Sequence, residues 1–463
     1  MVHIKISKGL DIPIEGKPEG APKALIPAGE ASSLSTPHQI ALDLSPFEEV
    51  KFKVLAKLGD AVKLGQPLAE DKDFPGRFFV SPAGGVVREI RRGLKRKLLD
   101  IVIDVANQEE SEQQAKIDPE TIGRQELIEY LKKGGVFSSI RQRPFNFLAD
   151  PNQTPRSIFV KALESAPFMP PAEMQVVGYE KEFQAGLDAL TKLTTGKVHL
   201  VYRLDTPCRA FSEAKNVEKH TAEGPHPISN QSLHIQTIDP IKTAETVIWT
   251  LDTHSVIRLG YLLLYGKYFV DRVVSVAGPG IIEGQIGYFK VRDGFPIAAL
   301  HAGRVKKGYM RLISGEPLVG RKVETEDYLG YHDFVFCVIP ENTKREFLHF
   351  FRLGLDKYTC SKAYLSGHFD PSNKDYYFTT NQHGEHRPFI DNTLYDKVMP
   401  LSIPTMHLVK AVMAEDYELA ERLGLLEVDS EDFVLPAFVD PSKIEMNHII
   451  KDGLRRYAAD VLK

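Results

Sequence analysis

Two arginines and a phenylalanine lie close together in the segment GGVFSSIRQRPF, residues 134–145. The segment starts with two glycines at an expected helix end and brings Arg141, Arg143 and Phe145 within a few positions of one another. Guanidinium groups bind carbonyl or phosphate oxygens, and an aromatic ring stacks on a planar ligand. The segment is therefore a candidate ligand site. Arg-Pro-Phe is also an ordinary way to anchor a loop at a domain edge, and both interpretations remain open.

A histidine, His226, lies inside the stiff turn GPHP, residues 224–227. A histidine held in this way is a candidate proton donor to a redox ligand. The alternative interpretation is that His226 caps a helix or a turn.

Three further histidines and the three cysteines of the chain are residue types that could bind a metal or act as nucleophiles: His368, His383, His386, Cys208, Cys337 and Cys360. The histidines lie in a Gly/Asn-rich loop without a fixed helical face, so we expect no metal site there. The cysteines are far apart, with no CxxC pair and no disulfide framework, and we assign them no catalytic role. No glycine-rich nucleotide phosphate loop of a known pattern occurs.

The segment from Lys51 to Val105 resembles the barrel-sandwich fold of biotinyl and lipoyl carrier domains. Carrier domains present their modified lysine at the tip of a tight hairpin. Here the turn residues are Pro75 and Gly76, and we predict Lys72 on the strand that leads into the turn. A carrier function through Lys72 is therefore only a weak alternative.

Six cations cluster near the end of this domain: Arg88, Arg91, Arg92, Lys95, Arg96 and Lys97. Such a cluster can dock an acidic partner or an anionic membrane surface. The alternative is a solvated hairpin turn.

The chain has 463 residues, more than one domain with a single hydrophobic core usually contains. We therefore expect several domains to position these residues. Hydrophobic content of 43% with 26% charged residues is typical of globular proteins, and no apolar run reaches the roughly 20 residues that span a bilayer. The first residues show no secretory signal, so we expect a cytoplasmic protein. The net charge of −4 does not indicate nucleic-acid binding.

Strand and helix patterns alternate through the middle of the chain. We predict a helix that opens at Pro119 and ends at Gly134, and strands at 157–163 and 197–204 around a helix at 180–196. This order indicates a parallel sheet. We predict one further helix from about Ile241 to Tyr265.

A β-rich region is expected to begin at DRVVSVAGPG, from Asp271, and FVFCVIP at 334–340 indicates a strand. After it we predict a helix from Asn342 to Leu355 and an irregular span at 369–388. The tail is expected to be helical and to end at Gly424, with an apolar stripe made by Val409, Val412, Met413, Ala420 and Leu423.

Many short motifs along the whole chain resemble one family, the A subunit of the sodium-translocating NADH:quinone oxidoreductase. In chain order these are KGLDIPI, GDAVKLGQPL, SIRQRPF, GPHP, DRVVSVAGP, RLISGEPLVG, YLGYH, KYTCSKAYLSG, MPLSIPT and LGLLEVDSEDF. That family is related to the NADH-binding flavoprotein subunit of complex I and to the C subunit of the Rnf complex.

The resemblance implies what this chain has lost. The related complex I and Rnf subunits hold FMN in a glycine-rich stretch. The corresponding stretch here is residues 132–145, where bulky and charged side chains replace most of the glycines. The relatives also bind iron–sulfur clusters through cysteines, and this tail has none. We therefore expect no flavin, no cluster and no NADH site in this chain.

The resemblance implies an α/β multidomain fold in four parts. These are a barrel-sandwich domain at 1–107, a Rossmann-like α/β domain at 108–267, a β-grasp, SLBB-like domain at 268–335 and a mostly helical region at 336–463. The expected role is that of a peripheral subunit on the cytoplasmic side of the bacterial inner membrane, with the other five subunits, B to F, as partners.

The family also implies participation in ubiquinone binding and in the quinone-reduction step that is coupled to Na⁺ export. Arg141, Arg143, Phe145 and His226 have suitable chemistry for a quinone. The isolated chain is not expected to oxidise NADH. The alternative from another class is a catalytically silent scaffold subunit of the same complex.

Overall fold

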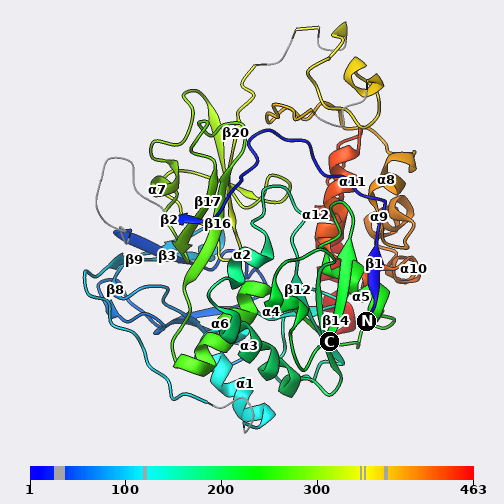
Figure 1. Cartoon of the computed structure of the whole chain (residues 1–463). Coiled ribbons are helices and arrows are strands. Elements are labelled where there is room, and N and C mark those ends of the chain that lie inside the picture. Colours follow the sequence, from blue (N-terminus) through cyan, green and yellow to red (C-terminus); the bar gives the residue numbers. More distant parts are fainter. Residues whose placement is uncertain (25–36, 118–121, 345–346, 349–350, 370–373, 463) are drawn as a thin grey trace.

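The computed structural model describes residues 1–24, 37–117, 122–344, 347–348, 351–369 and 374–462. Its described part contains a β-sandwich, an α/β sheet, a second mixed sheet and a group of C-terminal helices (Figure 1). The predicted α/β multidomain fold class is confirmed. Among the described residues, no helix is both long and apolar enough to cross a membrane.

The sandwich consists of two antiparallel sheets that enclose one apolar core. The first sheet has the order β3-β9-β8-β5, with β3 at Gln39–Asp43, β9 at Leu98–Val105, β8 at Gly85–Arg92 and β5 at Ala61–Val62. The second has the order β4-β6-β7, with β4 at Phe52–Val54, β6 at Pro67–Asp71 and β7 at Phe78–Val80. Strand β6 ends at Asp71, so Lys72 is the first residue of the loop before β7 and not part of the strand as predicted.

The largest sheet has seven strands in the order β1-β14-β13-β12-β15-β10-β11. Their bounds are His3–Lys5, Glu218–Glu223, Lys197–Arg203, Ser157–Ala162, Ile248–Asp252, Arg141–Arg143 and Phe147–Leu148. The strands from β1 to β15 are parallel, and β10 and β11 add an antiparallel edge. The strands with nearly continuous apolar sequence are buried on both sides, as in a parallel sheet covered by helices.

Helices connect and cover this sheet: α1 (Arg124–Lys133), α2 (Ala172–Val176), α3 (Glu180–Leu193), α4 (Arg209–Ser212), α5 (Gln231–Ile238) and α6 (Thr253–Tyr265). The sequence prediction of one helix from Ile241 to Tyr265 is wrong, because strand β15 occupies its middle. A short apolar run does not distinguish a buried strand from a helix by periodicity. Helix α6 starts only after Asp252, whose carboxylate accepts a hydrogen bond from the Ser255 N–H. Pro119, the predicted opening of α1, lies outside the described residues.

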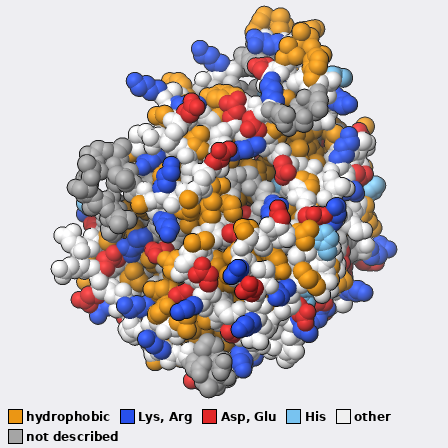
Figure 2. Space-filling view, viewed as in Figure 1, with side chains coloured by type: hydrophobic (Ala, Val, Ile, Leu, Met, Phe, Trp, Pro, Cys, Tyr) orange, Lys and Arg blue, Asp and Glu red, His pale blue; other side chains and the backbone are white. Residues whose placement is uncertain are grey.

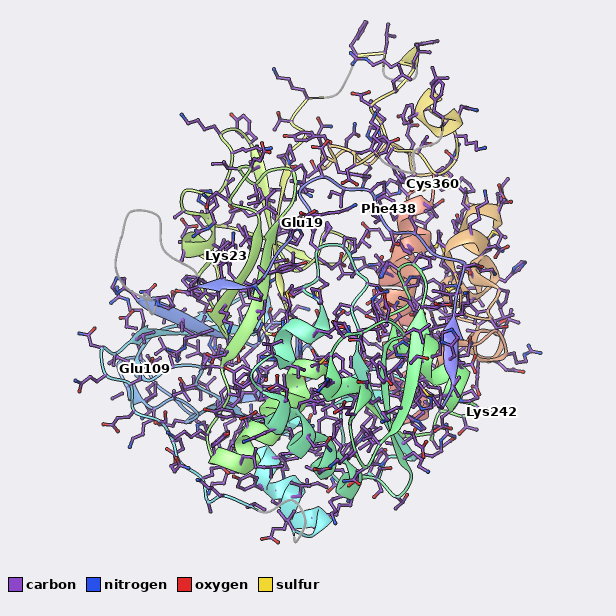
Figure 3. The ribbon with its side chains drawn as sticks, in the orientation of Figure 1. Glu19, Lys23, Glu109, Lys242, Cys360 and Phe438 are labelled. Atoms are coloured by element: carbon purple, nitrogen blue, oxygen red, sulfur yellow. The ribbon has the colours of Figure 1, made fainter. Side chains whose placement is uncertain are left out.

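The N-terminal residues cross between layers. Strand β1 pairs in parallel with β14 of the large sheet, and β2 (Lys23–Ala24) pairs with β17 of the mixed sheet. Figure 3 labels Lys23 of β2 and Glu109, which follows the sandwich and forms an ion pair with Arg292 at 2.5 Å. The N-terminal segment thus links the large sheet to the mixed sheet, and the Glu109–Arg292 pair joins the end of the sandwich to the mixed sheet.

The mixed sheet has six strands in the order β19-β18-β20-β16-β17-β2. The remaining bounds are β16 at Asp271–Ala277, β17 at Gly287–Arg292, β18 at Met310–Ser314, β19 at Arg321–Val323 and β20 at Val335–Pro340, with α7 at Ile297–His301. Among the described residues of 342–355, none forms an α-helix, so the predicted helix there is wrong. Leu353 and Leu355 have no core to cover and remain exposed.

The C-terminal helices are α8 (Thr393–Val398), α9 (Thr405–Met413), α10 (Tyr417–Arg422), α11 (Val434–Val439) and α12 (Met446–Val461). The predicted stripe holds at Val409, Val412 and Ala420, which are buried. Met413 is 54% exposed, because the chain turns between α9 and α10 instead of continuing as one helix. The apolar side chains of these helices pack against the large sheet in one shared core.

Candidate functional site

A cavity of about 350 Å³ opens at the carboxyl ends of β12 and β15. The four parallel strands β14, β13, β12 and β15 have the chain order three-two-one-four, so the winding reverses between β12 and β15. In open α/β sheets, ligands bind at this switch point, outside the carboxyl ends of the strands. Lys161 of β12 and Asp252 of β15 are register partners there, and both line the cavity. The topology thus marks the cavity as the candidate site.

All four parts of the chain contribute to the wall of the cavity. The sandwich supplies Glu49, the large sheet supplies most strand residues, the mixed-sheet region supplies His332, and α12 supplies Leu454 and Arg455. A site built in this way exists only when the parts are packed together.

Arg141 lines the cavity from the antiparallel strand β10. Its Nη1 donates to Glu49 Oε1 at 2.9 Å, and its guanidinium lies 5.4 Å from the centre of the Phe47 ring. Its Nη2 lies 3.4 Å from Nε2 of His332. Arg141 therefore ties the sandwich to the large sheet and borders the cavity at the same time.

Arg143 is almost completely buried and lines the same cavity. Its Nη1 donates to Ser232 Oγ at 2.9 Å, whereas its Nη2 has no hydrogen-bond partner among the described residues. A buried donor without a partner costs free energy, so each such group in a native protein needs an explanation.

Phe145 provides an apolar part of the wall. It is 7% exposed, and its ring centre lies 6.1 Å from that of Phe147. Leu251 and Leu454 also line the cavity. These side chains form an apolar part of a wall that is otherwise mostly polar or charged.

Lys161 and Glu431 add titratable groups that the sequence prediction missed. Lys161 forms an ion pair with Glu164 at 3.0 Å; burial lowers its pKa, but Glu164 and Glu431 outweigh that effect and raise it. Glu431 lines the cavity as an exposed residue, and the protein atoms around its carboxyl group desolvate it in part. This desolvation, together with Asp429 nearby, raises the pKa of Glu431 above the ordinary value for a glutamate.

The two missed residues carried a weak signal. Lys161 is near the end of a predicted strand, and a lysine at the carboxyl end of a parallel strand points to a ligand site. Glu431 lies in the family motif LGLLEVDSEDF but has no local pattern, so only the tertiary structure brings it to the cavity.

The structure brings Arg141, Arg143 and Phe145 together, and it places His226 outside the cavity wall. His226 is buried, and its Nδ1 lies 3.0 Å from Ser165 Oγ. Burial and the charge of Lys161 lower the pKa of His226 to about 4, so its imidazole is neutral at physiological pH.

The two glycines that precede this segment serve packing. A Cβ atom at Gly134 would lie 2.2 Å from Cδ2 of Leu262 in α6. A Cβ atom at Gly135 would lie 2.7 Å from Cγ1 of Val80 in β7, at a φ of +72°. The space in front of both glycines is therefore filled by side chains.

The histidines with metal-binding chemistry have other contacts. His383 Nδ1 lies 3.2 Å from the Tyr364 hydroxyl, and His368 Nε2 lies 3.2 Å from the carbonyl of Lys362. Among the described residues, no group of three or more His, Cys, Asp or Glu side chains is arranged to hold a metal ion. Cys337 is buried in β20, and Figure 3 labels Cys360 near Phe438.

Three family models match the chain. They are the NqrA N-terminal barrel-sandwich hybrid domain at residues 4–106, the NqrA second alpha/beta domain at residues 122–268 and the NQRA C-terminal domain at residues 273–325.

Similar proteins cover the chain almost end to end. The A subunit of the Na(+)-translocating NADH-quinone reductase of Chlamydia pneumoniae is 37% identical over 99% of this chain and 98% of its own length. The protein of the same description from Chlamydia caviae is 38% identical over 99% of this chain and 97% of its own length. The A subunit of Saccharophagus degradans is 37% identical over 98% of this chain and 99% of its own length.

A solved NAD+-reducing nickel–iron hydrogenase in its hydrogen-reduced state is 10% identical, with a TM-score of 0.34 over 73% of this chain and 64% of that chain. This likeness is too weak to carry a functional conclusion. The family matches agree with the sandwich and α/β parts of the fold. The chain belongs to the NqrA family, the A subunit of the Na(+)-translocating NADH-quinone reductase, and is thus one component of a translocase.

Proposed function

We propose that this chain is a peripheral subunit on the cytoplasmic side of the membrane and that its cavity binds the head group of ubiquinone. It would do so in the quinone-reduction step that is coupled to Na⁺ export. Its relatives are subunits of an NADH-quinone reductase, which supports a quinone as the ligand.

The observation that carries the proposal is the buried Arg143 at the cavity wall, whose Nη2 has no partner among the described residues. A quinone offers carbonyl oxygens that accept hydrogen bonds, and a ligand oxygen would satisfy this donor. Arg141 is a second donor group on the wall, and Phe145 offers an apolar surface to the ring. The three residues thus supply the kinds of contact that a quinone head group requires.

Quinone reduction takes up two electrons and two protons, and the electrons would come from other subunits. Glu431 lines the cavity with a raised pKa, so it is a candidate to hold a proton next to the ligand. Lys161 nearby keeps a positive charge that favours negative charge on a bound oxygen.

The proposal includes no flavin, no iron–sulfur cluster and no NADH site in this chain. Leu262 and Val80 fill the space in front of Gly134 and Gly135, which supports the view that this loop does not cradle a phosphate. The three cysteines of the sequence are too few for one four-cysteine cluster. The electron carriers would then belong to the partners, subunits B to F.

The test is a titration of the full chain with a short-chain ubiquinone analogue. Trp249, the single tryptophan, is buried in β15 beside the cavity-lining Thr250, so its fluorescence reports ligand binding. We expect saturable quenching. Arg141→Gln should weaken binding on the order of tenfold.

Lys242→Gln is the matched control, because Lys242 is an exposed cation that does not line the cavity (Figure 3). His226→Gln should also retain binding, since His226 lies outside the wall. Absence of saturable binding to the wild type would favour the scaffold role. Unchanged binding by Arg141→Gln would place the quinone elsewhere.

A further inference from the structure

The hairpin between β8 and β9 ends in an exposed tip that is both apolar and cationic. Leu94 at the tip is 93% exposed. Four neighbouring cations are exposed as well, Arg92, Lys95, Arg96 and Lys97, and a fifth, Arg88, is exposed lower on strand β8. Among the described residues, no acidic side chain lies within ion-pair distance of these five, and the one such interaction at longer range is that of Lys97, whose charge helps to lower the pKa of Glu48.

The backbone of the tip is unusual for its residues. Lys95 and Arg96 have φ values of 54° and 60°, both in the left-handed region. The Lys97 N–H donates to the Leu94 carbonyl at 3.1 Å and closes a turn whose two central residues are Lys95 and Arg96. Two-residue turns of this kind favour Asn and Gly, which adopt positive φ easily. The sequence instead keeps a lysine and an arginine where the backbone disfavours them, which points to a function for their charges.

The stem of the hairpin is held rigidly. Arg91 lies 3.7 Å from Asp100 in β9 and 3.6 Å from Asp327 beyond β19, and its guanidinium lies 5.3 Å from the centre of the Tyr328 ring. Its Nη2 also donates to the Glu326 carbonyl at 3.1 Å. Arg91 therefore fixes the stem to the mixed-sheet region, while the tip extends beyond it. In Figure 1, β8 lies at the left edge, away from both termini.

The charge of the tip is local. The chain carries a net charge of −4, and Figure 2 shows acidic and basic side chains interspersed over the visible face. General attraction to a negative surface is therefore not expected, and any such attraction has to come from this cluster.

We propose that the tip of this hairpin docks on anionic lipid head groups, with Leu94 inserted at the membrane interface. Interfacial binding combines an apolar side chain that enters the bilayer surface with cations that meet anionic lipids. Long lysine and arginine side chains reach the head groups while their stems lie along the apolar boundary. A single exposed leucine among flexible cations matches a lipid surface better than a shaped protein interface, which needs a packed apolar centre. The hairpin residues do not line the quinone cavity, so this proposal is independent of it.

The test is flotation of the full chain with vesicles. Vesicles of phosphatidylcholine are compared with vesicles in which about a third of the lipid is phosphatidylglycerol. We expect binding to the anionic vesicles only, and its loss at high salt. Lys95→Glu/Arg96→Glu should reduce the bound fraction on the order of tenfold or more, and Leu94→Ser should reduce it by a smaller factor.

Lys181→Glu/Lys215→Glu is the matched control, because it reverses two exposed lysines elsewhere on the chain and changes the net charge equally. It should bind like the wild type. Equal binding by the hairpin variant, an equal loss in the control variant, or no binding of the wild type to anionic vesicles would each overturn the proposal. If only assembly with partner subunits depended on Lys95 and Arg96, the tip would dock on protein and the lipid proposal would be wrong.

Discussion

Two regions of the molecule bury arginines, and they do so in different ways. In one, Arg258 of α6 and Arg272 of β16 share the carboxylate of Asp293, at 2.5 Å and 2.7 Å. Arg272 also donates to the carbonyls of Tyr331 and Asp333, and Arg258 donates to the Tyr331 hydroxyl. In the other region, Arg143 has one hydrogen bond to a side chain, to Ser232, and borders a cavity.

The difference separates a structural joint from a site. All four Nη atoms of the two arginines at Asp293 have partners, and no described cavity wall includes either arginine, although Nε of Arg258 has no partner among the described residues. We name this group the Asp293 joint. It connects α6 to the mixed sheet and leaves no terminal donor for a ligand. Arg143 borders the cavity and has one buried terminal donor without a partner among the described residues, a property that we expect of a binding site.

The largest effect is expected at the Asp293 joint. Asp293→Asn leaves two buried guanidinium charges without their carboxylate, which should destabilise the protein by about 3–5 kcal/mol. Chemical unfolding followed by circular dichroism and Trp249 fluorescence measures this. Glu213→Gln is the control, since its pair with Arg209 is on the surface and should matter by less than about 0.5 kcal/mol. A loss below about 1 kcal/mol for Asp293→Asn would remove the distinction between the two regions.

The second largest loss of stability is expected at Gly134, which precedes the segment of Arg141, Arg143 and Phe145. Gly134→Ala should destabilise the protein by about 1–3 kcal/mol, because its Cβ would overlap Leu262. Gly134 has a helical φ of −76°, so backbone strain does not contribute. In the double variant with Leu262→Ala, the two costs should not add, and the unfolding cycle should show a coupling of about 0.5–3 kcal/mol. Simple additivity would contradict the packing role of Gly134.

A matched pair of conservative changes compares the two regions directly. Arg143→Lys should lower ubiquinone-analogue affinity about tenfold, because lysine cannot reproduce the planar fork of donors. Its cost in stability should stay below about 1.5 kcal/mol, the value of its bond to Ser232. Arg258→Lys should cost more stability and leave affinity unchanged. If Arg258→Lys lowered the affinity and Arg143→Lys mainly lowered the stability, the ligand site would lie at the Asp293 joint and not at the cavity.

The smallest effect is a pH dependence at Glu431. Its pKa is raised in the folded protein, so its neutral form is favoured at low pH and lost as pH rises through the raised value. The wild type should therefore lose stability relative to Glu431→Gln as pH rises, and its quinone affinity should fall by less than about threefold. Titrations from about pH 6 to about pH 9 measure both. Identical pH profiles of the two proteins would remove Glu431 from the site.

Sequence patterns predicted much of the fold where they are strongly periodic or strongly punctuated. The strands at 157–162 and 197–203 and the helix at 180–193 lie within a few residues of their predicted bounds. The prediction failed at 241–265, where an apolar run serves as a strand and then a helix. It also failed at Met413, because a turn between two helices has no signature in the apolar stripe.

The sequence by itself determined the chemistry available to the site and the family to which the chain belongs. Arg141, Arg143 and Phe145 are adjacent along the chain, so local spacing was enough to select them, and many colinear motifs were enough for the family.

Only the tertiary structure decided which distant residues meet them. Glu49, Lys161 and Glu431 reach the same cavity from three parts of the chain, and His226 does not line it. The physical reason is that the cavity forms at a strand crossover and a junction of packed layers. Its members are selected by the order of strands in the sheet and by burial, and neither is written in local spacing.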